Sequence, residues 1–89
     1  MKSFPFLISG PEGDVFRGDV TFVSLRGEEG NLAVMAGHIP FVTSVKPCDV
    51  EIDLSDETTK KGHTDGGILT VDKDIVTLIS GTFSWVEGV

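Results

Sequence analysis

The sequence predicts an all-β domain, and two observations support that prediction. Apolar residues recur at every second position in stretches such as 4–9 (FPFLIS) and 20–25 (VTFVSL), which is the period of a strand with one buried face. Turn-forming residues interrupt the chain about every eight to twelve residues, a spacing typical of a β-sandwich or barrel. Eighty-nine residues are enough for one domain, so we expect a single flattened β-sandwich over residues 1–89.

Eight segments have the composition and length of short strands. Each is rich in Val, Ile, Thr or Phe, the residue types that fit a pleated, half-buried surface, and none has a helical face. In chain order they are residues 4–9, 20–25, 32–35, 41–45, 50–54, 68–71, 75–79 and 82–86. The segment 20–25 is apolar in both registers, which indicates either a covered central strand or a surface for a partner.

The segments between these strands contain the residues that turns require. Glycine, proline, aspartate and asparagine are concentrated there, because they fit the backbone angles of tight turns. The predicted turns are residues 10–14, 27–30, 37–40, 55–61, 65–67 and 72–74. Gly66 and Gly67 form a structural turn that leads into a strand, so they do not resemble a phosphate-binding loop at the start of a helix.

Charge and composition exclude several classes of function. The formal net charge of −7 and the scattered basic residues leave no stripe that could bind a nucleic acid backbone. No apolar run approaches the roughly 18 residues of a membrane-spanning helix, and the amino terminus, interrupted by Pro5, lacks a signal-peptide pattern. The one cysteine, Cys48, excludes an internal disulfide and fits a reducing compartment. We therefore expect no nucleic acid partner and no direct membrane insertion.

The polar residues do not form a catalytic or metal-binding pattern. His38, Cys48 and His63 match no compact zinc-ligand spacing, and nothing beside Cys48 marks it as an activated nucleophile. The acidic residues of segment 53–57 do not reproduce a calcium-binding loop. The tripeptide Arg17-Gly18-Asp19, known from cell adhesion, lies in what looks like a turn between strands. We therefore predict no catalytic residue, no metal and no cofactor.

The segment 27–47 (GEEGNLAVMAGHIPFVTSVKP) is the most informative part of the chain. Gly37 can adopt positive φ, while Pro40 fixes its own φ and pushes the preceding residue toward an extended conformation. His38 is thereby presented on a stiffened turn before a new strand. Two interpretations are open: His38 contacts a partner, or it bonds a neighbouring carbonyl and fastens the turn.

These residues resemble the signature of the epsilon subunit of F-type ATP synthase. The resemblance rests on residues 30–43 (GNLAVMAGHIPFVT) with Pro47, and it extends to residues 16–20 (FRGDV), 66–71 (GGILTV) and 75–79 (IVTLI). It implies a flattened sandwich of about ten strands that joins the central-stalk gamma subunit to the ring of c subunits. It also implies a non-catalytic subunit of a proton- or sodium-translocating complex, peripheral to the cytoplasmic face of a bacterial inner membrane.

The resemblance further assigns contact residues to the two partners. Asn31 replaces an acidic residue that is common in the family, so the preceding glutamates are the carboxylates available to basic loops of the c ring. The expected c-ring contacts are Glu28, Glu29, Gly30 and Asn31, and the expected gamma-subunit contacts are His38 and Thr43.

Two expectations concern the end of the sequence and the competing functions. Family members continue into a helical hairpin that inhibits ATP hydrolysis and in some cases binds ATP, whereas this sequence stops at Val89, so neither inhibition nor nucleotide binding is expected of it. The alternative function is a free-standing binding module for a carbohydrate or a surface protein, with Trp85 as the surface aromatic. An enzyme that uses His38 in a pocket is the third interpretation.

Overall fold

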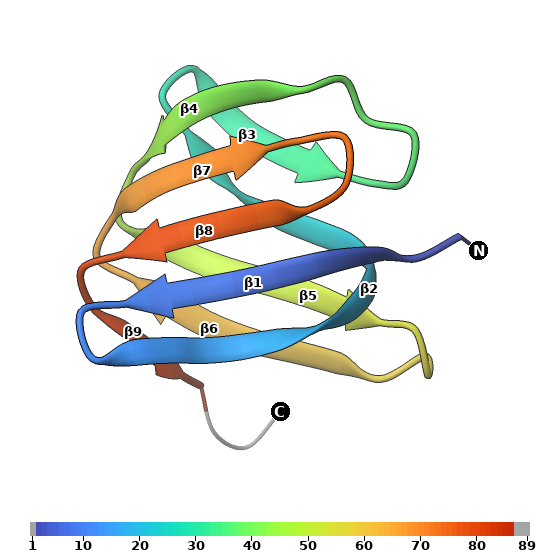
Figure 1. The fold of residues 1–89 in the computed structure, drawn as a ribbon. Helices are drawn as coiled ribbons and strands as arrows, with labels where there is room; N and C mark the ends of the chain where they lie inside the picture. Colours follow the sequence, from blue (N-terminus) through green and yellow to red (C-terminus); the bar gives the residue numbers. More distant parts are fainter. Residues whose placement is uncertain (1, 87–89) are drawn as a thin grey trace.

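The computed structural model of the chain describes residues 2–86, and every regular element within them is a strand (Figure 1). The nine strands are β1 (Phe4–Gly10), β2 (Gly13–Gly27), β3 (Gly30–Val34), β4 (Phe41–Val45), β5 (Cys48–Leu54), β6 (Thr59–Thr64), β7 (Gly67–Val71), β8 (Val76–Ser80) and β9 (Phe83–Trp85). The predicted all-β class is confirmed, with nine strands where the resemblance implies about ten.

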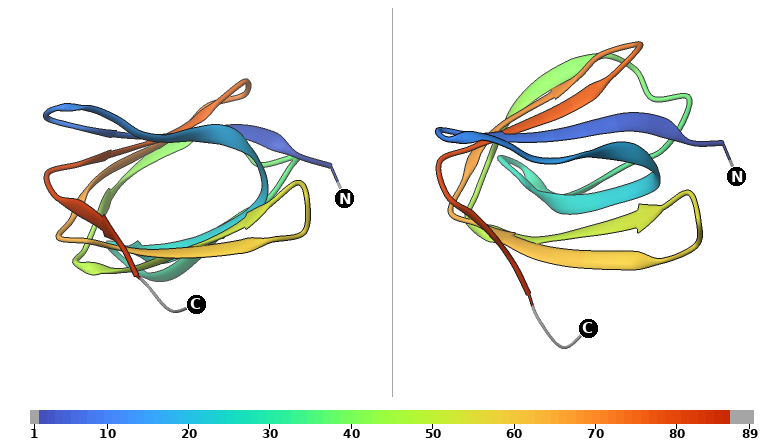
Figure 2. Two further views of the ribbon diagram at one scale, coloured as in Figure 1. Left: turned by 90° about the horizontal axis from the view of Figure 1, so that it is seen from below. Right: turned by 60° about the horizontal axis from the view of Figure 1, so that its bottom comes forward.

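The strands form one continuous sheet that folds back on itself as two layers. Along the hydrogen-bonded path the order is β1-β8-β7-β4-β2-β5-β6-β9, with β3 beside β2 and a further pairing between β1 and β2. Strands β1 and β8 run parallel, and the other pairs are antiparallel. Figure 2 shows the result as a flattened barrel, with β2 curving from one layer into the other.

Strand β2 joins the two layers because its halves have different neighbours. The first half pairs with β1, whereas the second half pairs with β3 and β5. A β-bulge between Val20 and Phe22 shifts the alternation of side chains, so that Val20 and Val23 are both fully buried. The apolar residues in both registers of segment 20–25 are therefore explained by a bulged, covered strand.

The core lies between the two layers and is almost entirely aliphatic. Its largest fully buried apolar side chains are Phe6, Ile8, Val20, Val23, Val34, Val50, Ile52, Leu69, Val71, Val76 and Leu78. Two hydroxyl groups are buried beside it, and the Oγ1 atom of Thr64 lies 2.6 Å from the Oγ atom of Ser80. Both hydroxyls also bond to main-chain atoms of the adjacent turns, so the layers are connected here without an unpaired polar group.

Two segments predicted as turns lie partly or wholly in strands: residues 59–61 of the predicted turn 55–61, and residues 17–19. Only residues 55–58 turn, and β6 begins at Thr59. Strand β6 has no large apolar residue, because the Phe83 side chain of the neighbouring strand β9 fills the space at its inner face. A Cβ atom on Gly62 would lie 2.3 Å from the Phe83 ring. The tripeptide Arg17-Gly18-Asp19 likewise lies inside β2, paired with β1, and not in a turn.

Candidate functional site

The tip of the β2–β3 hairpin presents the carboxylates that the family resemblance implies as c-ring contacts. Glu28 and Glu29 form the turn, and the main chain closes below them where Gly27 pairs with Gly30. Both glutamates are exposed. The Oε2 atom of Glu28 accepts a hydrogen bond of 3.3 Å from the hydroxyl of Ser44. The tip is therefore exposed and acidic, and the Glu28 side chain is hydrogen-bonded to β4.

A cation lies beside this acidic tip. The Nε atom of Arg26 donates to the Oδ1 atom of Asn31 at 3.5 Å, across the base of the hairpin. The amide of Asn31 is thus held by the guanidinium of Arg26. Both signs of charge are available to a partner at this end of the molecule.

An open groove of about 620 Å³ runs between the tip and strand β4. Thr43 contributes to its wall, and its hydroxyl lies 3.5 Å from the position that a Cβ atom on Gly27 would take. The groove is lined by Gly27, Glu28, Glu29, Gly30, Asn31, Leu32, Phe41, Val42 and Thr43. The structure therefore brings Thr43 together with the four expected c-ring residues.

His38 lies at the other end of β3, in the loop that leads to β4 (Figure 1). Gly37 has φ of 88° in this loop, and Pro40 precedes the first residue of β4. The imidazole of His38 faces the carbonyl oxygens of Met35 and Asp72, at 2.9 and 2.8 Å. The expected gamma-subunit contacts thus have different neighbours: Thr43 lies beside the hairpin tip, whereas His38 lies beside Met35 and Asp72.

The outer surface of β1, β8, β7 and β4 carries no charge at any of its strand positions, all of which lie in the described part of the chain. Cross-strand pairing places its residues on one surface, because directly paired residues share a face. Exposure is high for Val42 (68%), Ile79 (52%) and Ile68 (48%). We call this surface the uncharged face; it consists of Pro5, Leu7, Ser9, Val42, Ser44, Ile68, Thr70, Thr77 and Ile79.

The uncharged face was not predicted from the sequence. The signal was present, since Ile68 and Ile79 occupy the positions that alternate with the buried residues Leu69 and Leu78. An isoleucine at an outward position of an antiparallel sheet indicates an exposed apolar surface, which is typical of a contact with a partner.

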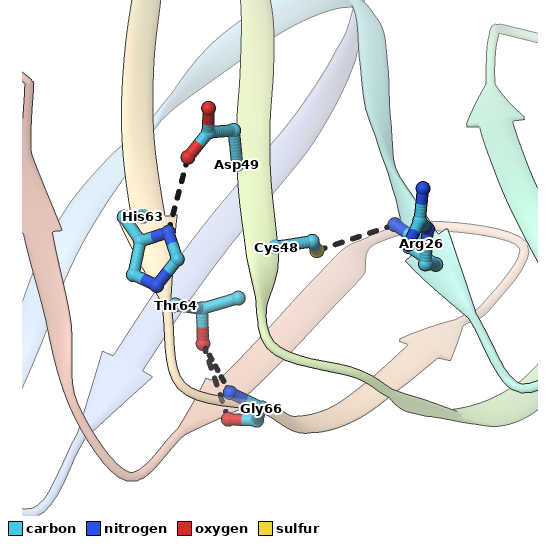
Figure 3. Close-up of polar contacts among 6 residues, drawn as sticks. All are labelled: Arg26, Cys48, Asp49, His63, Thr64 and Gly66. Atoms are coloured by element: carbon cyan, nitrogen blue, oxygen red, sulfur yellow. Dashed lines mark hydrogen bonds and ion pairs between the residues drawn. The ribbon is translucent and has the colours of Figure 1, made fainter.

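The opposite layer has a different surface. Along its strand β5, outward-facing charged residues alternate with buried core residues. The outward residues of β5 are acidic, and Glu51 and Asp49 pair across the strands with Lys61 and His63. Asp49 accepts a 3.0 Å bond from the Nδ1 atom of His63, as Figure 3 shows. This layer has the surface expected of a face in contact with water.

The residues considered for metal or nucleophilic chemistry do not converge. Cys48 is partly buried, and its Sγ atom accepts a hydrogen bond from the backbone N–H of Arg26 at 3.3 Å (Figure 3). His63 of β6 is bonded to Asp49, and His38 lies in the β3–β4 loop. Among residues 2–86, no group of three potential ligands is positioned to hold a metal ion. No helix in that range has the length and apolar character needed to cross a membrane.

Trp85, the aromatic residue of the alternative function, is packed into a cluster of side chains. Its ring makes edge contacts with Phe83 and Phe16, at centroid distances of 5.0 and 6.0 Å. The Nζ atom of Lys60 lies 4.5 Å from the Trp85 centroid. The ring therefore stabilises the end of the barrel and is only partly available to a ligand.

Comparison with known proteins agrees with the fold and with the residue pattern. The chain is 38% identical over 71 residues to the ATP synthase epsilon chain of Delftia acidovorans, a match that covers 80% of this chain and 51% of the relative. The chain thus spans about half the length of this curated relative.

Two solved structures have the same fold. One is a chain of the Euglena gracilis mitochondrial ATP synthase OSCP/F1/c-ring structure, with a TM-score of 0.89, 18% identity, and coverage of 98% of this chain and 56% of that chain. The other belongs to the central stalk/c-ring structure of Tetrahymena thermophila mitochondrial ATP synthase, with a TM-score of 0.77, 12% identity, and coverage of 92% and 66%.

The family comparison covers almost the whole chain. Residues 3–86 match the family described as ATP synthase, Delta/Epsilon chain, beta-sandwich domain. This range includes all nine strands of the structure. The chain therefore belongs to the ATP synthase delta/epsilon chain family, of which it contains the β-sandwich domain.

Proposed function

We propose that the chain is a non-catalytic subunit of the central stalk of an ion-translocating ATP synthase. In this role it links the gamma subunit to the c ring, so that rotation couples ion flow to nucleotide chemistry. The family match over residues 3–86 is the observation that carries the proposal. In a bacterial cell the subunit would be peripheral to the cytoplasmic face of the inner membrane.

The distribution of surface residues supports two separate contacts. The uncharged face has the apolar side chains that the centre of a stable protein interface needs, and we assign it to the gamma subunit. The acidic tip at Glu28 and Glu29 has the charge that basic c-ring loops would recognise. We propose that Gly30 and Asn31 join the tip contact and that His38 and Thr43 contribute to the gamma contact, as the resemblance implies.

The chain needs no reacting group for this role, because it holds two rotor parts in a fixed relation. A stable interface of this kind buries on the order of 1,600 Å² in total, with a few apolar anchors inside a polar rim. Ile68, Ile79 and Val42 are the candidates for anchors, because they are large, apolar and about half or more exposed.

Reconstitution of the complex with and without this chain tests the function. Ion pumping driven by ATP should fall relative to ATP hydrolysis when the chain is omitted, and adding it back should restore the ratio. Pumping that stays fully coupled without the chain would refute the proposal. Co-purification with the gamma subunit distinguishes the rotor subunit from a free-standing binding module.

A further inference from the structure

Arg26 is an exposed residue near the end of β2, at the base of the hairpin tip. Its main chain has three neighbours. It pairs with Asn31 of β3, its N–H donates to the Sγ atom of Cys48, and its carbonyl oxygen accepts a 3.0 Å bond from the N–H of Lys46. These contacts hold the start of the Arg26 side chain in a defined place beside the tip, and none of them involves its guanidinium.

The guanidinium of Arg26 keeps its positive charge available. Its Nε atom contacts the Oδ1 atom of Asn31, at 3.5 Å, and this acceptor is a neutral amide. Among residues 2–86 its Nη atoms make no hydrogen bond, and no carboxylate forms an ion pair with it. Arg17, the other arginine of the sequence, lies with its Nη2 atom 3.1 Å from the Asp14 carboxylate. A long bond to an amide orients a guanidinium without neutralising it, so Arg26 can still bind an anion.

The hairpin tip separates two open grooves that differ in charge. The groove of about 620 Å³ beside β4 contains Glu28 and Glu29. A second groove, of about 480 Å³, lies beside β5 and contains Arg26. Asn31 lines both grooves, so it marks the ridge between them. A partner that covers the tip would therefore meet carboxylates on one side and a guanidinium on the other.

The one carboxylate that lines the second groove already has a partner. Asp49 accepts a 3.0 Å bond from the Nδ1 atom of His63 and forms no ion pair with Arg26. Figure 3 shows Asp49 on the side of β5 that faces His63, and Arg26 on the other side, beyond Cys48. An incoming carboxylate would thus not have to displace a charged group from Arg26.

We propose that Arg26 is a contact residue for the c ring and binds a carboxylate on one of its polar loops. An arginine can hold both oxygens of a carboxylate through two parallel N–H bonds, which a lysine cannot do. This role rests on the proposed function, because it adds Arg26 to the tip contact of Glu28 and Glu29. The loop that fits this end of the domain carries a basic group for the glutamates and an acidic group for Arg26.

A carboxylate of a protein loop fits this end of the domain better than the phosphate of an anionic lipid. Either group can bind a guanidinium, but an anionic membrane surface attracts clusters of basic residues. Glu28, Glu29 and the net charge of −7 would be repelled by such a surface. A loop that carries both signs of charge is not repelled in this way, so the charges around the tip favour the protein partner.

Binding of the chain to c rings in nanodiscs, after assembly with the gamma subunit, tests the contact. Arg26→Gln removes the charge and leaves the main-chain bonds to Cys48 and Lys46 in place. The Kd of the assembled variant for the c ring should rise about tenfold, the size of effect expected when one hydrogen bond to a charged group is lost.

Arg17→Gln is the matched control, because it removes the same charge from the first half of the same strand. Its assembled complex should bind the c ring as tightly as the unsubstituted one. Equal affinity of Arg26→Gln and Arg17→Gln would overturn the role of Arg26. If the unsubstituted complex does not bind the c ring, the proposed function is refuted and the Arg26 contact with it, whereas equal affinity of the two variants refutes the Arg26 contact alone.

Substitutions in the c ring identify the carboxylate that Arg26 binds. Each acidic residue of the polar loops is replaced by its amide, and one replacement should weaken binding of the unsubstituted chain about tenfold. That replacement should add nothing when it is combined with Arg26→Gln. This measurement uses the unsubstituted chain, so the test stands even if Arg26→Gln does not fold. If no loop residue behaves in this way, the assignment is wrong; if the effect of Arg26→Gln also disappears in nanodiscs without anionic lipid, the ligand is a lipid phosphate.

Discussion

Substitution of Ile68 and Ile79 by threonine should weaken binding to the gamma subunit without unfolding the domain. These residues pair directly across β7 and β8 and are 48% and 52% exposed. Complete burial of an isoleucine side chain contributes about 1.5–3 kcal/mol, so the half still exposed here can contribute about 0.8–1.5 kcal/mol per residue on binding. Together they give about 1.5–3 kcal/mol, or a rise in Kd of about 10- to 150-fold.

Threonine is chosen because it keeps the strand conformation. It is β-branched like isoleucine, and Thr70 and Thr77 already occupy outward positions of the same strands. The buried halves of the two isoleucines also stabilise the fold, so the variant should lose about 1.5–3 kcal/mol of unfolding free energy. That loss leaves a domain of ordinary stability folded at 25 °C, which circular dichroism and thermal unfolding can verify.

The control is a second cross-strand pair in the opposite layer. Glu51→Thr with Lys61→Thr removes one charge of each sign from β5 and β6 and leaves the net charge unchanged. Its affinity for immobilised gamma subunit should match that of the unsubstituted chain. Equal affinity of the folded isoleucine variant and the control would show that the uncharged face does not contact the gamma subunit.

Two further predictions concern stability and pH. Gly62→Ala should lower the unfolding free energy by about 1–3 kcal/mol in thermal denaturation, because its Cβ would lie 2.3 Å from the Phe83 ring; an equal effect of Gly81→Ala, whose Cβ has ordinary contacts, would contradict this reason. The hydroxyl and then the backbone N–H of Thr58 hold the pKa of Asp56 below its ordinary 3.8, so these bonds stabilise the turn above that pH and are lost as pH falls through the lowered value. A carboxyl titration followed by NMR should have its midpoint below 3.8.

The strands that alternate regularly could be predicted from sequence. In β7 and β8 the buried residues Leu69 and Leu78 alternate with Ile68 and Ile79, and no bulge interrupts the pairing of these strands. The hairpin tip was also visible, since glycines flank the two glutamates. These features depend on residues close together in the chain.

The features that were missed depend on contacts between distant segments. Strand β6 looks polar because its inner face accommodates Phe83 of β9, which no local pattern around Gly62 reveals. The bulge after Val20 arises only when β2 pairs with β5. Even where a local bond was foreseen, as for His38 with a neighbouring carbonyl, the second carbonyl came from Asp72 in another turn.

The parallel pairing of β1 with β8 determines when this domain can finish folding. Hairpins such as β5–β6 and β7–β8 join neighbouring segments and can form early, whereas β1 must wait for a strand from the far end of the chain. Proteins dominated by such distant pairings fold in about milliseconds to seconds. During synthesis β1 leaves the ribosome first and has only β2 as a neighbour, with its other edge free to pair with another chain. The strand that closes the barrel is therefore also the point at which newly made copies would first aggregate.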